Sequence, residues 1–190
     1  RQVAAYSNVI GNDVLEEVMD KNLDHFIPIG YTEEELAYAG KFKEVVTELD
    51  KEGLKDMIAH VVEKDKRKEV LDMPLLDFKL DRSESYGGGG STDVGDVSWC
   101  IPTAQINTST FPAQAPGHSC RMSPVDGHPL PTKNMLLAGK VIAATAIDLM
   151  EKPDVLQAAK DEFNKKMKRY GGYTCPVPQG AVPVIPGEKM

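Results

Sequence analysis

Apolar residues recur at helical spacing in the first third of the chain. From Asn12 they repeat every three or four positions, as on one face of a helix, and Asn12 is itself a favoured N-cap residue. Pro28 and Gly30 then end the pattern. A second run follows Thr32, where the sequence Thr-Glu-Glu-Glu is a capping box. The pattern predicts these two amphipathic helices and a third, highly charged helix across residues 52–70.

Two later segments have the composition of β-strands. Residues 94–101 and 103–108 are rich in β-branched side chains, and Pro102 separates them. Two more helices are expected after them, one across residues 133–151 and another that Pro153 opens at its first turn. Alanine and glycine in the first of these helices would permit close packing. The pattern therefore predicts an α/β fold in which helices pack on a mixed sheet.

The composition is that of a globular protein with an acidic surplus. The chain has 190 residues and a formal net charge of -7, so no basic surplus is available to neutralise the phosphates of a nucleic acid. No apolar run approaches the roughly 18 residues of a membrane-spanning helix. The cysteines are odd in number and have no C-x-x-C spacing, which predicts free thiols and a cytoplasmic protein: Cys100, Cys120 and Cys175.

The run GGGGSTDVGDVSW, residues 87–99, has more than one interpretation. Its glycines resemble a flexible linker. Strand-forming residues follow them directly, however, which favours a backbone that approaches a ligand closely. A phosphate-binding P-loop is disfavoured, because Ser91, Thr92 and Asp93 occupy the place where a Lys-Ser or Lys-Thr pair is required, and the acid would repel a phosphate.

His118 is the histidine whose position points to chemistry. It follows a Pro-Gly turn after the predicted strands, and α/β proteins place functional groups in such loops. With Asp93 and Asp96 upstream, it is a candidate metal ligand or a member of a His–Asp pair. A Ser–His–Asp triad is disfavoured, because Ser98 lacks the G-x-S-x-G turn that exposes a nucleophile. No chemical role is expected for the other histidines: His25, His60 and His128.

The run GGGGSTDVGDVSW, then PGHS and then LLAGKVIAATAIDLM, resembles one enzyme family. It is similar to the C-terminal part of the aminobenzoyl-glutamate hydrolases. These belong to the di-metal amidohydrolases and exopeptidases that include the aminoacylases and the glutamate carboxypeptidases. The resemblance extends over nearly the whole chain, including the helix after Thr32, the segment PDVLQAAKDEF and the proline-rich tail.

The resemblance implies that the chain is the C-terminal piece of a larger enzyme. Residues 1–7 would be the last strand of an inserted lid or dimerisation domain, residues 8–175 the C-terminal part of the catalytic domain, and residues 176–190 a proline-rich tail. In the family an H-x-D pair, a bridging aspartate and a Glu-Glu general base lie upstream, and no H-x-D occurs here. The chain is therefore expected to be inactive alone and to contain no catalytic residue.

For the full-length protein the resemblance implies a metal-dependent amidohydrolase or peptidase. It would hydrolyse the amide bond of an N-acyl amino acid or small peptide with two divalent ions, zinc or manganese. His118 would be a metal ligand, and Ser91, Thr92, Asp93 and Asp96 would line the substrate cleft or orient a ligand. The expected partners are this substrate, the N-terminal part of the same enzyme and further copies in a homo-oligomer, but no nucleic acid or membrane. The alternative is a non-catalytic structural or assembly domain.

Overall fold

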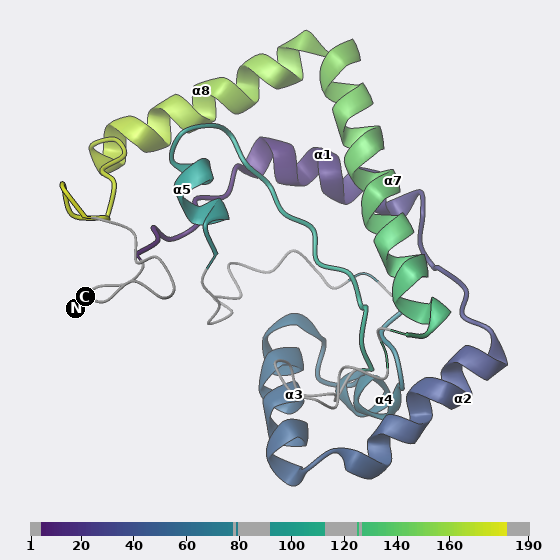
Figure 1. Ribbon diagram of the computed structural model, residues 1–190. Helices are drawn as coiled ribbons and strands as arrows, with labels where there is room; N and C mark the ends of the chain where they lie inside the picture. Colours follow the sequence, from purple (N-terminus) through teal and green to yellow (C-terminus); the bar gives the residue numbers. More distant parts are fainter. Residues whose placement is uncertain (1–4, 78, 80–91, 113–124, 126, 182–190) are drawn as a thin grey trace. The chain divides into compact units, whose positions relative to one another are not determined.

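The computed structural model describes residues 5–77, 79, 92–112, 125 and 127–181, whose path Figure 1 traces. Every regular element in these residues is helical, and they contain no β-strand. The α/β fold with a mixed sheet that the sequence predicts is therefore wrong for the described part of the chain. Two compact units make up the chain, and each combines stretches that are distant in sequence.

The terminal unit consists of Arg1–Val18, Gly89–Gln105 and Ala146–Met190. Its own helices are the short α5 (Val94–Ser98) and the long α8 (Pro153–Tyr170). The predicted three-part division at residues 7 and 175 is a different partition of the chain, and it stays a prediction.

The middle unit consists of Met19–Gly88 and Ile106–Thr145. Two helices begin in one unit and end in the other, α1 (Asp13–Asp24) and α7 (Pro129–Glu151). Of the helical elements whose bounds the structure describes, those that lie wholly in the middle unit follow one another along the chain: α2 (Glu33–Lys41), the 3-10 helix η1 (Phe42–Val45), α3 (Glu48–Val61) and α4 (Arg67–Asp72).

Two clusters of buried apolar side chains stabilise the middle unit. Burial of one such side chain contributes about 1.5–3 kcal/mol. In the first cluster, residues of α2 and η1 pack with the start of α7, and Tyr31, Tyr38 and Phe111 lie against them; its buried members are Ala39, Phe42, Leu75, Val125 and Leu130. The second joins α3 to α4, through Leu54, Ile58, Val62 and Val70.

Residues 94–98 form the helix α5, although their composition predicts a strand. Thr92 organises the first turn: its hydroxyl accepts a hydrogen bond from the Val94 N–H at 3.3 Å, and its carbonyl accepts one from the Gly95 N–H at 3.1 Å. At the other end, the buried Ser98 hydroxyl donates to the Gly95 carbonyl at 2.6 Å. Hydroxyl side chains that bond to nearby backbone thus fix a turn here.

Residues 103–108 also form no strand. Thr103 contributes its carbonyl to a hydrogen bond from the Asn12 N–H, at 3.1 Å. The β-branched side chains that predict a strand favour a pleated surface packed against a neighbouring strand. The described residues provide no such neighbour, so the same side chains remain in irregular structure.

The starts predicted for α1, α2 and α8 are confirmed because they depend on local capping, whereas α7 begins at Pro129 and not at residue 133. The Asn12 side-chain oxygen accepts a hydrogen bond from the Leu15 N–H at 3.1 Å, which makes Asn12 the N-cap of α1. Thr32 and Glu35 form the complete capping box of α2. Gly171 ends α8 with a positive φ of 82°, a conformation that glycine adopts at little cost.

The charged helix predicted across residues 52–70 is two helices. The first, α3, begins earlier, at Glu48, and the side chains of its N-cap Thr47 and of Asp50 form a second capping box. Arg67 lies at the start of α4 and donates to the carbonyls of Ala59 at 2.7 Å and of Val62 at 2.9 Å. This side chain satisfies the last carbonyls of α3, so the chain turns between the two helices.

Among the helices that the structure describes, none has both the length and the apolar composition to cross a membrane.

Candidate functional site

The predicted site residues are only partly within the described chain. His118 and Ser91 lie outside the described residues, whereas Thr92, Asp93 and Asp96 lie at the start of α5 and within it. Asp93 is exposed, and its carboxylate is 3.5 Å from the Thr92 hydroxyl. Three of the five predicted residues are therefore described, and they are neighbours in the sequence on one short segment.

Asp96 connects three parts of the terminal unit. Its Oδ1 accepts hydrogen bonds from the Ser7 hydroxyl at 2.8 Å, from the Ser7 N–H at 3.3 Å and from the Tyr173 hydroxyl at 3.1 Å. We call Ser7, Asp96 and Tyr173 the Asp96 cluster. Its aspartate stands 89 positions from Ser7 and 77 from Tyr173 in the sequence, so it holds α5 to segments near both ends of the chain.

Gly95 places its backbone directly against residue Ser7. A Cβ atom at this position would lie 1.9 Å from the Ser7 carbonyl oxygen, which excludes any other residue. The glycines for which the sequence predicts a close backbone approach to a ligand, residues 87–90, lie outside the described residues, and the approach at Gly95 is to the chain itself. Two further bonds attach the same segment: the Ser98 hydroxyl accepts from the Ile10 N–H at 2.8 Å, and the Trp99 indole N–H donates to the Asn8 carbonyl at 2.9 Å.

Tyr173 is held as a hydrogen-bond donor in this cluster. Although the side chain is exposed, desolvation of the hydroxyl and its hydrogen bonding to Cys175 and to the carboxylate of Asp96 raise its pKa to about 12. A phenol is protonated throughout the neutral range even at its ordinary pKa near 10, and here it donates to Asp96. Through three hydrogen bonds at one oxygen, Asp96 fixes α5 to Ser7 and Tyr173, and its predicted role at a substrate cleft or metal site stays a prediction.

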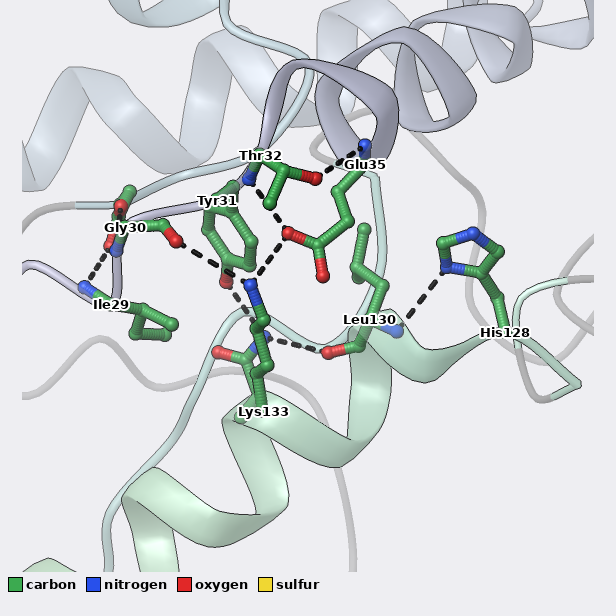
Figure 2. Close-up of polar contacts among 10 residues, drawn as sticks. Ile29, Gly30, Tyr31, Thr32, Glu35, His128, Leu130 and Lys133 are labelled. Carbon is green, nitrogen blue, oxygen red and sulfur yellow. Dashed lines mark hydrogen bonds and ion pairs between the residues drawn. The ribbon is translucent and has the colours of Figure 1, made fainter.

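A second polar group lies in the middle unit, between α2 and α7 (Figure 2). The Lys133 ammonium is 2.7 Å from Glu35 Oε2, which also accepts the Thr32 N–H at 2.7 Å. The hydrogen bond from Lys133 holds the pKa of the Glu35 carboxyl below its usual value, against the opposing effect of burial. The capping carboxylate of α2 is therefore also an ion-pair partner of α7.

Asn134 extends this group into the interior. It is fully buried, and its Nδ2 donates to the Tyr31 hydroxyl at 2.7 Å, while its Oδ1 has no hydrogen-bond partner in the described part of the chain. Burial raises the pKa of the Tyr31 hydroxyl, although the bond from Asn134 acts in the opposite direction. Sequence patterns do not reveal these contacts, because Tyr31 and Asn134 are 103 positions apart.

His128 is half-buried and has a structural role that sequence analysis missed. Its ring stacks on Tyr38 with the centroids 3.9 Å apart and the planes 5° from parallel. Its Nδ1 accepts a hydrogen bond from the Leu130 N–H at 3.3 Å, near the first turn of α7 (Figure 2). The sequence signal that points to this role is the His-Pro pair, a candidate cap residue before a proline at the first helical position.

The described residues do not by themselves form a metal centre. No group of three or more His, Cys, Asp or Glu side chains within them is arranged to hold a metal ion. Asp96 is occupied by Ser7 and Tyr173, and Asp93 belongs to no such group in this part of the chain. Cys100 and Cys175 are free thiols, as predicted, and Cys120 lies outside the described residues.

Comparisons with known proteins show a distant relationship to a hydrolase. No family model matches the sequence, and no solved structure matches it. One of the subunits of the p-aminobenzoyl-glutamate hydrolase of Escherichia coli (strain K12) is 30% identical to the chain over 186 residues, which cover 94% of this chain and 38% of that protein. The chain therefore spans less than half of the length of this relative and is distantly homologous to that part of it.

Proposed function

We propose that this chain is the C-terminal part of a metal-dependent amidohydrolase. The observation that carries the proposal is the 30% identity to a hydrolase component, because the matched stretch covers 94% of the chain and is not confined to one motif. The name of the relative describes a hydrolase of p-aminobenzoyl-glutamate, in which an amide bond joins an aromatic acyl group to an amino acid. We extend this class to N-acyl amino acids and small peptides as substrates.

The proposal includes two divalent metal ions, zinc or manganese, in the full-length protein. When bound, such ions polarise a carbonyl and lower the pKa of a water molecule. We propose His118 as one ligand, with the other ligands and the general base supplied by the N-terminal part of the same enzyme. The full-length protein is also proposed to form a homo-oligomer.

The described residues would act by holding the segment that precedes α5. We propose that Ser91, Thr92 and Asp93 line the substrate cleft. Asp96 fixes the adjacent helix to Ser7, and Gly95 allows the contact to be close. This arrangement supports the proposal by giving Thr92 and Asp93 a rigid base, which positioning of a substrate requires.

The test is the substitution His118→Ala in the full-length protein. Loss of a group that only orients a metal ligand costs about 10–100-fold in affinity or activity, so loss of the ligand itself should cost at least as much in bound metal and in kcat. The matched control is His25→Ala, because His25 is exposed, whereas His128 is stacked on Tyr38 and caps α7. Full metal content and an unchanged kcat in His118→Ala, with folding verified by thermal melts, would refute the assignment of His118.

A further inference from the structure

Helix α7 has apolar side chains on two opposite sides. One side is buried, through Leu130, Leu137 and Val141. The opposite side exposes Met135, Leu136 and Ile142, with exposed fractions of 63%, 55% and 53%. We call the surface formed by Met135, Leu136, Gly139, Ile142 and Ala143 the outer α7 face.

The outer α7 face is broad. At 100° of rotation per residue, its five members spread over about 120° of the helix surface. The same stripe continues along α7, where Ile147 and Met150 are exposed by 50% and 75%. A helix with apolar residues on opposite sides is typical of the interior of a larger protein, where layers cover it on both sides.

Gly139 lies in the middle of this face, and the packing of the described residues does not require a glycine there. A Cβ atom there would meet no other atom within 4 Å in the described chain. Glycine inside a helix costs about 1 kcal/mol relative to alanine, and α7 accepts this cost between exposed apolar neighbours. A surface that approaches the helix backbone closely would account for the glycine, because any side chain would hold that surface away.

Gly53 is the natural comparison. It lies inside α3, and a Cβ atom there would likewise meet nothing within 4 Å among the described residues. Its helical surroundings are polar, however, with exposed charged residues at Glu52, Lys55 and Asp56. The outer α7 face therefore differs from α3 in combining a free glycine position with several large exposed apolar side chains.

We propose that the outer α7 face packs against a broad apolar surface of the remaining polypeptide of a longer protein, with Gly139 at the closest approach. This inference rests on the part of the proposed function that assigns the chain to a longer enzyme. More than half of the relative has no counterpart in this chain, so enough polypeptide exists there to form such a layer. A 120° face is also wider than the narrow seam that one helix of a second copy would cover.

The experiment compares Gly139→Leu with Gly53→Leu, each in the 190-residue chain and in the full-length protein. In the 190-residue chain both variants should melt at or slightly above the temperature of the parent, because leucine has the higher helix propensity and meets no neighbour. In the full-length protein, Gly139→Leu should lower Tm by about 2 °C or more through overpacking, and Gly53→Leu should not. If Gly139→Leu does not fold, Ile142→Gln takes its place, because it adds no volume. It should likewise lower Tm in the full-length protein but not in the 190-residue chain.

Three results would overturn the inference. The first is an equal Tm for Gly139→Leu, Ile142→Gln and the parent in the full-length protein. The second is a dimer of the 190-residue chain, measured by light scattering, that becomes a monomer in the Gly139→Leu variant. In that case a second copy of the chain covers the outer α7 face. The third is a natural protein that contains no further polypeptide. The melting experiment does not depend on amidase activity. A full-length protein without that activity would therefore refute the proposed function, whereas the melting temperatures would still test this inference.

Discussion

At the scale of single residues, carboxylates that accept hydrogen bonds from the backbone also connect distant segments of the chain. Glu35 completes the capping box of α2 and pairs with Lys133 of α7, and Asp96 accepts from both Ser7 and Tyr173. Each of these carboxylates is partly or largely buried and joins distant segments, so its contribution exceeds that of a solvated surface pair. The loss of one such carboxylate therefore affects two elements at once.

Glu35→Gln tests the contribution of the Glu35 carboxylate to stability, through the dependence of the free energy of unfolding on pH. Glutamine keeps the cap but loses the charge that Lys133 pairs with, so we expect a loss of about 1–2 kcal/mol at pH 7. The folded-state pKa of Glu35 is lowered, so its contribution is present above the unfolded value near 4.3 and is lost as pH falls through the folded value. Urea unfolding should therefore show wild type and variant converging in acid.

The control for this prediction is Glu48→Gln. Glu48 also has a lowered pKa, because Lys51 donates a hydrogen bond to it, but its side chain is 80% exposed. Solvent screens an ion pair of this kind, so its loss should leave the urea midpoint close to that of wild type. An equal loss of stability in both variants at pH 7 would contradict the role of Glu35 between two helices.

At the scale of elements, the sequence predicted the helices well and the strands poorly. The starts of α1 and α2 follow from Asn12 and Thr32, which cap through bonds three residues away. The strand predicted from Val94 was wrong, because β-branched residues form a strand only where a neighbouring strand exists. Helical signals are local and can be found in sequence, whereas strand signals depend on distant partners.

Asn12→Ala tests capping at element scale. Asn12 is 2% exposed, caps α1 and also donates from Nδ2 to the Ala159 carbonyl of α8 at 2.9 Å. Its removal loses the cap and leaves a buried carbonyl without that donor, so the free energy of unfolding should fall by about 2–3 kcal/mol. Thr47→Ala removes an exposed cap of α3 and should cost about 1 kcal/mol. The midpoints of urea unfolding measure the loss of stability in both variants. Equal shifts would argue against a contribution from the bond between Asn12 and the Ala159 carbonyl.

At the scale of the whole molecule, long-range contacts are what the sequence could not reveal. The sequence predicts that the segment around Asp96 lies at a substrate cleft, which stays a prediction, and in the structure this segment contains the Asp96 cluster. Its partners Ser7 and Tyr173, however, lie 89 and 77 positions away. The stacking of His128 on Tyr38 was missed for the same reason. Composition and spacing identify a segment, and only the fold identifies what it contacts.

The activity of the chain alone is a prediction about the whole molecule. We expect the purified 190-residue chain to have no amidase activity above background, even with added zinc or manganese, because the resemblance places the H-x-D pair and the Glu-Glu general base upstream, and no H-x-D occurs in this sequence. Release of an amino acid from a panel of N-acyl amino acids measures this. Turnover that a chelator abolishes would show that the chain needs no N-terminal part.

The bond between Asn12 and Ala159 also has a consequence for synthesis on the ribosome. The two residues are 147 positions apart, so Asn12 lacks its bond to the Ala159 carbonyl until 147 further residues have been translated. At about 5–20 residues per second, that delay is roughly 7–30 s. During it, the nascent start of the terminal unit has no α8 to pack with and is open to chaperones. Slow codons before residue 159 would lengthen this exposed period.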